Sequence, residues 1–252
     1  MKFARKSLPL IAVLALVVVE YQSFGAEREP VVSGVVKFEG KFPKRKPIVM
    51  TTKNGTVSDC QPLHKTPLLS ERYIISKKGG VANAFVYVKK GYERKEYPVP
   101  KKPAVLNQDK CMFRPRIQGV LVGQKFLMRN SDPVLHNVRS LSSRNRPFNI
   151  GQPAKTPDRE KTFTLREYPI QMQCDLHPWM KAWVFVMEHP YFSVTDEKGQ
   201  FSIKGLPKGD YTLAVWHELF GEQEMKITVG DSGSTGLMFT YKKKSRSNSE
   251  RQ

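Results

Sequence analysis

Residues 173–180 read Gln-Cys-Asp-Leu-His-Pro-Trp-Met, and the apolar run Ala-Trp-Val-Phe-Val-Met follows at 182–187. The β-branched and aromatic residues of the second stretch predict a strand, and the proline of the first is typical of a turn. Within the first stretch, Cys174, His177 and Met180 recur at intervals of three residues. A short loop that runs directly into a strand therefore presents a thiol, an imidazole and a thioether together.

A second histidine lies at the end of another predicted strand. Residues 123–130 (Gly-Gln-Lys-Phe-Leu-Met-Arg-Asn) have strand character, and 131–138 (Ser-Asp-Pro-Val-Leu-His-Asn-Val) continue from them. Two histidines, one cysteine and one methionine form a soft ligand set, which suits a metal that cycles between Cu(I) and Cu(II). A trigonal His2Cys site with a weak axial methionine is typical of electron-transfer copper. The pattern therefore predicts one copper ion per chain, held by His136, Cys174, His177 and Met180.

Other interpretations of these residues are weaker. A lone cysteine or methionine is usually core filler, but four such residues in this arrangement are harder to explain in that way. Structural zinc in the same ligands is disfavoured because zinc rarely takes a methionine. A nucleophilic pair of Cys174 and His177 is disfavoured because no third residue that would orient it is evident.

The rest of the chain has the pattern of an all-β protein. Short segments rich in β-branched and aromatic residues are separated by turn residues such as Gly79-Gly80 and Lys208-Gly209. Strands at this spacing usually form Greek-key β-sandwiches, whose loops carry function. The polar stretch Leu141 to Thr162 predicts a long loop without strands. The predicted strands are Val31–Phe38, Ala82–Val88, Gly119–Met128, Ala182–Met187, Gln200–Ile203, Tyr211–Trp216 and Met225–Val229.

Over residues 105–188 the chain resembles the cupredoxins, in their amicyanin and plastocyanin branch. The resemblance rests on Val-Gly-Gln at 122–124, Leu-His-Asn-Val at 135–138, and the segment 173–180. The short gap between His177 and Met180 is the amicyanin form. The resemblance implies a Greek-key β-sandwich that binds copper, with His136, Cys174 and His177 as equatorial ligands and Met180 as the axial ligand.

The resemblance also implies roles for residues around the ligands. Asn137 is expected to tie the two ligand loops together by hydrogen bonds. Pro178 has no backbone N–H, so one possible hydrogen bond to the cysteine sulfur is missing. His177, flanked by Pro178 and Trp179, is expected to reach solvent in an apolar patch where a redox partner docks. Four basic residues close to the ligand loops in the sequence are expected to surround this patch with positive charge: Arg139, Arg144, Arg146 and Lys181.

The two remaining cysteines, Cys60 and Cys111, are candidates for a disulfide. If Cys174 binds the metal, these two are left as a pair, and an oxidising compartment favours their bond. Two unpaired buried thiols are one alternative. A second metal site formed by Cys60 and His64 is the other.

The flanks of the copper segment carry a second resemblance. Residues 194–201 and 206–213 resemble the end of a carboxypeptidase regulatory-like, transthyretin-like β-sandwich, and residues 32–36 and 84–88 resemble its start. This predicts a copper domain at 102–188 that is inserted into one further sandwich. The two parts of that sandwich would be 31–101 and 189–241, while two sandwiches in series remain the alternative. We assign no chemistry to this second sandwich, and His189 and His217 are expected to be structural.

The two ends of the chain predict targeting and a tail. Lys2, Arg5 and Lys6 precede an apolar run at 8–19, and small residues follow, as in a signal peptide that spans 1–26. An uncleaved anchor is the alternative, but a spanning helix needs about 20 apolar residues. We therefore expect a protein exported to the periplasm or the extracellular space, without a membrane span after cleavage. Residues 242–252 predict a disordered basic tail.

The chain has 252 residues and a formal net charge of +19. Nucleic acid is disfavoured as a partner, because the basic residues are spread along the chain and no nucleic-acid-binding motif is present. The charge instead favours acidic redox proteins or an anionic surface. The sequence thus predicts an electron carrier and not an enzyme. Resemblance to amicyanin implies partners of dehydrogenase and cytochrome type. The alternatives are a copper chaperone or storage protein, or an adhesion or scaffold protein.

Overall fold

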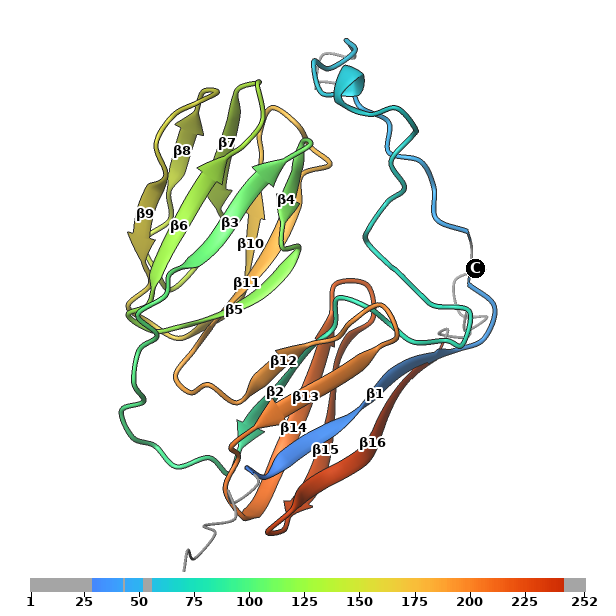
Figure 1. Cartoon of the computed structure of the whole chain (residues 1–252), viewed down its shortest axis with the longest axis vertical. Helices are drawn as coiled ribbons and strands as arrows, with labels where there is room; N and C mark the ends of the chain where they lie inside the picture. Colours follow the sequence, from blue (N-terminus) through green and yellow to red (C-terminus); the bar gives the residue numbers. More distant parts are fainter. Residues whose placement is uncertain (1–28, 43, 52–55, 243–252) are drawn as a thin grey trace, which may run out of the picture.

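The computed structural model describes residues 29–42, 44–51 and 56–242, and within them the fold is all-β, which confirms the predicted fold class. The strands form four sheets, which pack in pairs as two sandwiches (Figure 1). In this part of the chain no helix is long and apolar enough to cross a membrane. The predicted signal peptide at 1–26 and residues 243–252 of the predicted tail lie outside the described residues.

The first sandwich is formed by one continuous part of the chain. Its strands are β3 (Ala104–Asp109), β4 (Met112–Arg114), β5 (Ile117–Leu121), β6 (Lys125–Asn130), β7 (His136–Ser140), β8 (Asn149–Gln152), β9 (Arg159–Thr162), β10 (Glu167–Gln173) and β11 (Lys181–Met187). One sheet has the order β5-β11-β10-β7-β8 and the other the order β4-β3-β6-β9. Because β7 and β10 are neighbours, the ends of these two strands bring His136 close to Cys174.

The second sandwich is formed by strands that precede the first sandwich in the sequence and by strands that follow it. They are β1 (Val31–Glu39), β2 (Phe85–Lys90), β12 (Phe192–Val194), β13 (Gln200–Lys204), β14 (Gly209–His217), β15 (Gly221–Val229) and β16 (Gly233–Lys242). The sheets have the orders β13-β1-β16 and β12-β2-β14-β15. The chain thus leaves this sandwich after β2 and returns to it at β12 (Figure 1).

The segment between β1 and β2 reaches from the second sandwich to the first (Figure 1). We call its described residues between 44 and 75 the strap; its one regular element is the 3-10 turn η1 (Gln61–Leu63). A disulfide joins Cys60 of the strap to Cys111, in the turn between β3 and β4. Arg114 of β4 also makes two hydrogen bonds with Glu71 of the strap, at 2.6 and 2.8 Å. The strap is therefore fastened to the first sandwich at two points.

Strand β11 explains how the two sandwiches are held together. Val184 and Val186, on one face, belong to the core of the first sandwich. Phe185 and Met187, on the other face, belong to an apolar cluster shared with the second sandwich. Phe185 stacks on Phe85 of β2 with ring centroids 3.9 Å apart. Because both faces of β11 are covered, its residues are apolar in succession instead of alternating.

Two further contacts fix this junction. Arg116 and Glu218 form an ion pair at 2.7 Å, with side chains only 5% and 7% exposed. A Cβ added at Gly119 would lie 2.3 Å from the ring of Phe192, so the close approach of the two sandwiches requires a glycine there.

The structure corrects three of the predicted elements. Gly119–Met128 is not one strand, because Gly123, at φ +83°, turns the chain between β5 and β6. The predicted loop Leu141 to Thr162 contains β8 and β9, which are edge strands. All four residues of β9 are exposed, so no alternation of apolar residues marks it in the sequence. Lys242 belongs to β16 and pairs with Glu39, so this residue is not part of a disordered tail.

Candidate metal centre

The ligand loop connects β10 to β11. Cys174 directly follows β10 and Met180 directly precedes β11. The backbone N–H of Cys174 donates to the carbonyl of Met180 at 3.2 Å, and the N–H of Met180 donates to the carbonyl of His177 at 2.9 Å. These bonds close the loop into a tight turn. The three-residue intervals of the sequence therefore place all three side chains at one end of the sandwich.

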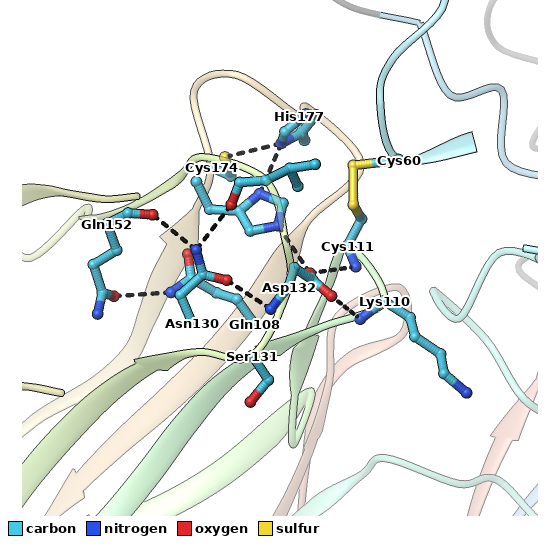
Figure 2. Close-up of polar contacts among 12 residues, drawn as sticks. Cys60, Gln108, Lys110, Cys111, Asn130, Ser131, Asp132, Gln152, Cys174 and His177 are labelled. Carbon is cyan, nitrogen blue, oxygen red and sulfur yellow. Dashed lines mark hydrogen bonds and ion pairs between the residues drawn. A yellow bond between two sulfur atoms is a disulfide. The ribbon is translucent and has the colours of Figure 1, made fainter. Parts of the chain in front are cut away.

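Three donor atoms converge at this end of the sandwich (Figure 2). Nδ1 of His136 lies 2.9 Å from Nδ1 of His177, and Sγ of Cys174 lies 3.7 Å from the same nitrogen of His177. All three residues are buried, with at most 6% of their surface exposed. Nitrogen lone pairs and a thiolate repel one another at this range unless a proton or a metal cation lies among them. The site is therefore suited to hold a cation.

The fourth predicted ligand, Met180, is fully buried and belongs to the same apolar cluster as Cys174. Two imidazole nitrogens, a thiolate and a thioether fit copper better than they fit zinc or a hard cation such as Mg²⁺. The residues present at this end of the sandwich thus fit the metal that the sequence predicts.

The cysteine has the electrostatic character of a metal ligand. Burial raises the pKa of Cys174. Hydrogen bonds from the rings of His136 and His177, and from the backbone N–H groups of Asn137 and His177, outweigh this effect and lower the pKa to about 6. The thiol therefore ionises near neutral pH, and the thiolate is the form that binds metals.

Asp132 is a residue of the site that the sequence analysis missed. Its Oδ2 lies 2.8 Å from Nε2 of His136, and both side chains are buried. Burial lowers the pKa of His136, but the carboxylate of Asp132 and the sulfur of Cys174 raise it overall. Burial raises the pKa of Asp132, but hydrogen bonds from His136 and two backbone N–H groups lower it overall. Its position four residues before His136 was the available signal, but the pair Asp132-Pro133 looked like an ordinary turn.

Asn137 links three segments around the sulfur. Its Oδ1 accepts the backbone N–H of Asp175 at 2.7 Å and lies 3.2 Å from Sγ of Cys174. Its Nδ2 donates to Oδ1 of Asn149, in β8, at 2.6 Å. Asn137 therefore connects β7 and β8 to the ligand loop. Pro178 is exposed and follows His177 without an N–H of its own.

The structure corrects the expectation that His177 reaches solvent. Only 6% of His177 is exposed. Sγ of Cys60 lies within 4.8 Å of ring nitrogens of His136 and His177, so the strap and its disulfide cover the histidines. No local sequence pattern predicts this cover, because the strap comes from a distant part of the chain. Trp179 is half-buried, with its ring 5.2 Å from that of His177, and its Nε1–H donates to the carbonyl of Cys111 at 3.1 Å.

The four basic residues expected near the ligand loops are exposed. One of them, Arg139, lies 3.5 Å from the carboxylate of Asp175. They are Arg139, Arg144, Arg146 and Lys181.

The remaining histidines lie outside the centre. A second metal site with Cys60 is ruled out because its sulfur is bonded to Cys111, and Nε2 of His64 instead lies 3.0 Å from the carbonyl of Lys110. Nε2 of His189 lies 2.9 Å from the carbonyl of Val88, and burial lowers the pKa of His189 to about 4. Burial, with Arg116 nearby, lowers the pKa of His217 to about 3. Both are neutral core residues at neutral pH.

Comparisons with known proteins find similarity to solved structures only. No family model matches this chain, and no curated protein matches it either. The chain is similar to a Cu-containing nitrite reductase from Thermus scotoductus SA-01, with 19% identity over 41% of this chain and 25% of that chain, at a TM-score of 0.33. It thus spans a quarter of that enzyme's length. It is also similar to a purple cupredoxin from Nitrosopumilus maritimus, with 22% identity over 33% of this chain and 99% of that chain, at a TM-score of 0.29. The chain is similar as well to an amicyanin variant in its Cu(I) form, with 18% identity over 40% of this chain and 98% of that chain, at a TM-score of 0.30.

Proposed function

We propose that this chain is an exported, mononuclear copper protein that carries single electrons between redox partner proteins. The observation that carries the proposal is the convergence of His136, His177 and Cys174 in a buried site. The pKa of Cys174, lowered to about 6, supports it further. Copper held there would supply one-electron redox chemistry within one fixed ligand set.

The surroundings of the site support transfer with little rearrangement. Asn137 ties the ligand loop to β7 and β8, and the backbone bonds between Cys174 and Met180 close the loop itself. The disulfide between Cys60 and Cys111 holds the strap against the histidines. Side chains that are fixed on several sides keep the same positions when the charge of the site changes.

Burial of the donor atoms supports a carrier over an enzyme. Cys174 and His136 are 2% and 0% exposed, and His177 is 6% exposed. A substrate molecule would have to displace the strap or the ligand loop to reach these atoms. An electron needs no such opening, because it passes through packed side chains.

Trp179 offers the route between the site and the surface. The ring centroids of Trp179 and His177 lie 5.2 Å apart. Trp179 also lines a cavity of about 370 Å³ between the strap and the ligand loop. Five charged residues line the same cavity, namely Glu71, Arg72, Arg116, Lys181 and Glu218. Glu71 is paired with Arg114 and Glu218 with Arg116, so Arg72 and Lys181 give the cavity its positive charge. We therefore propose that an acidic partner, of dehydrogenase or cytochrome type, docks around this cavity.

The visible absorption spectrum of the copper-loaded, oxidised protein tests the proposal. A thiolate bonded directly to Cu(II) gives an intense charge-transfer band, so the protein should be coloured and Cys174→Ser should lose the band. The paired change Cys60→Ser with Cys111→Ser is the matched control and should keep the band. A colourless copper complex, or a band that survives Cys174→Ser, would contradict the proposal.

A further inference from the structure

The carboxylate of Asp132 joins the metal centre to the turn that carries the disulfide. Its Oδ2 lies 2.8 Å from Nε2 of His136 and accepts the backbone N–H of Cys111 at 2.7 Å. Its Oδ1 accepts the backbone N–H of Lys110 at 2.6 Å. Figure 2 shows this carboxylate between the turn and the donor atoms of the site. One buried side chain thus contacts a metal ligand and both residues of the turn.

The turn itself needs the support that Asp132 gives. Lys110 and Cys111 form the two-residue connection between β3 and β4, and both have positive φ, at 50° and 52°. Turns of this kind normally carry Asn or Gly, because other side chains are strained there. The two N–H groups of the turn point at one carboxylate, and Cys111 is bonded to the strap. The disulfide and Asp132 therefore both hold the same strained turn, and Sγ of Cys111 lies within 4.8 Å of the carboxylate of Asp132.

Asp132 is in turn held by the strand before it. Its backbone N–H donates to Oδ1 of Asn130 at 3.0 Å. Nδ2 of Asn130 donates to the carbonyls of Val134 and Gln152, at 2.9 and 2.8 Å. The carboxylate therefore has little freedom to move away from His136.

This geometry decides which nitrogen of His136 carries the proton. An ionised carboxylate only accepts hydrogen bonds, so Nε2 of a neutral His136 must be the donor. Its Nδ1, which faces His177, is then free of a proton and can bind a metal. A carboxylate on the far nitrogen also makes an imidazole a stronger donor, which favours the more highly charged metal ion.

We propose that Asp132 is the positioning residue that fixes the proton of His136 on Nε2, and that through Asp132 the Cys60–Cys111 disulfide sets the reduction potential of the metal centre. The second half rests on the proposed function, whereas the first half holds for the metal-free protein.

Nitrogen NMR of the metal-free protein tests the first half. At a pH above the pKa of His136, the wild-type ring should be protonated almost entirely on Nε2. In Asp132→Asn the amide has one acceptor oxygen for three donors, so the ratio of the Nε2–H to the Nδ1–H form should fall at least about tenfold. The matched control is Asp196→Asn, since Asp196 also accepts two backbone N–H groups in a turn, but contacts no histidine. An unchanged ratio in Asp132→Asn would overturn the assignment.

Voltammetry of the copper-loaded protein tests the second half. In Asp132→Asn, Cu(II) affinity should fall about tenfold more than Cu(I) affinity, which is a rise of about 59 mV in the reduction potential. Replacing Cys60 and Cys111 together by Ala should raise the potential in the same direction. In the triple variant the disulfide change should add almost nothing to the effect of Asp132→Asn.

Additive shifts in the triple variant would show that the disulfide acts by another route, which refutes the coupling even if copper binds as proposed. Near-ultraviolet circular dichroism would show whether Asp132→Asn folds. If it does not fold, the coupling is tested by the variant in which Cys60 and Cys111 are both replaced by Ala. An unchanged His136 tautomer and an unchanged potential in that variant would also refute the coupling. Absence of copper binding would refute the proposed function and the coupling, but would leave the NMR result for Asp132 standing.

Discussion

Nδ1 of His136 lies 2.9 Å from Nδ1 of His177, although 41 residues separate the two histidines in the chain. The first begins β7, and the second lies in the loop after β10, the strand that pairs with β7. The sheet thus sets the distance between them, and the loop sets the direction of the second ring. The exchange of a residue in this loop should therefore change the metal centre without changing the fold.

Met180 provides the first such test. A thioether is a soft donor that favours Cu(I), whereas the amide oxygen of glutamine is harder and favours Cu(II). Met180→Gln should therefore lower the reduction potential while copper and the visible band are retained. Voltammetry of the two proteins measures the difference. Equal potentials would show that Met180 does not contact the metal.

The ion pair between Arg116 and Glu218 provides a test of the junction between the sandwiches. Both side chains are buried, and removal of one partner from a buried pair leaves an unpaired charge that costs about 3–5 kcal/mol. Glu218→Ala should therefore lower the free energy of unfolding by about that amount in urea denaturation. The exposed pair of Lys208 and Asp231 is the control, and Asp231→Ala should cost at most about 1 kcal/mol. Similar losses in the two variants would show that the first pair is open to water.

Part of the acid sensitivity should come from the buried histidine His189, and a further part from His217, whose pKa burial lowers to about 3. Burial lowers the pKa of His189 in the folded protein from 6.5 to about 4, so the unfolded chain takes up a proton as the pH falls through 6.5 and the folded chain does not. This proton uptake removes stability progressively from about pH 6.5 down to about pH 4. His189→Gln keeps a donor for Val88 and an acceptor for the N–H of Tyr191 but does not titrate.

The free energy of unfolding of His189→Gln should therefore depend less on pH than that of the wild type in this window. A second window lies lower, because hydrogen bonds from Ser142 and Asn145 outweigh burial and lower the pKa of Glu167 from 4.5 to about 2. The stability from Glu167 is present above pH 4.5 and is lost as the pH falls towards 2. Equal slopes for wild type and His189→Gln between pH 6.5 and 4 would contradict the assignment to His189.

The sequence predicted those features of the protein that depend on local pattern. The all-β class follows from short β-branched segments, and the positions of Cys174, His177 and Met180 in one loop follow from their spacing. The edge strand β9 escaped prediction because all its residues are exposed. The role of Asp132 escaped although it lies four residues before His136, because Asp132-Pro133 is also an ordinary turn sequence. The cover over the histidines escaped because it brings Cys60 of the strap close to His136 and His177, which are distant in the sequence. The pairing of Cys60 with Cys111 was a candidate, but local pattern carries no information on where that pair lies relative to the histidines.

The cavity beside Trp179 provides the last test, which concerns the docking face. Lys181 is exposed and lines this cavity with Arg72, so a negatively charged oxidant should be attracted to the side of the site where the tryptophan lies. Attraction between exposed charges is screened over about 8 Å at physiological salt, so the rate should fall as salt rises. Stopped-flow oxidation of the copper-loaded, reduced protein by ferricyanide measures this rate, and a cationic cobalt(III) ammine complex provides the opposite charge.

Lys181→Glu should slow oxidation by ferricyanide and accelerate oxidation by the cationic complex, with the visible spectrum unchanged. Lys226→Glu makes the same change of charge at an exposed position on β15, in the second sandwich, and serves as the control. If the docking face lies at the cavity, the effect of Lys181→Glu should be several times that of Lys226→Glu, because screening limits each charge to its own neighbourhood. Equal effects of the two changes would mean that only the net charge of +19 matters and that electrons leave the site elsewhere.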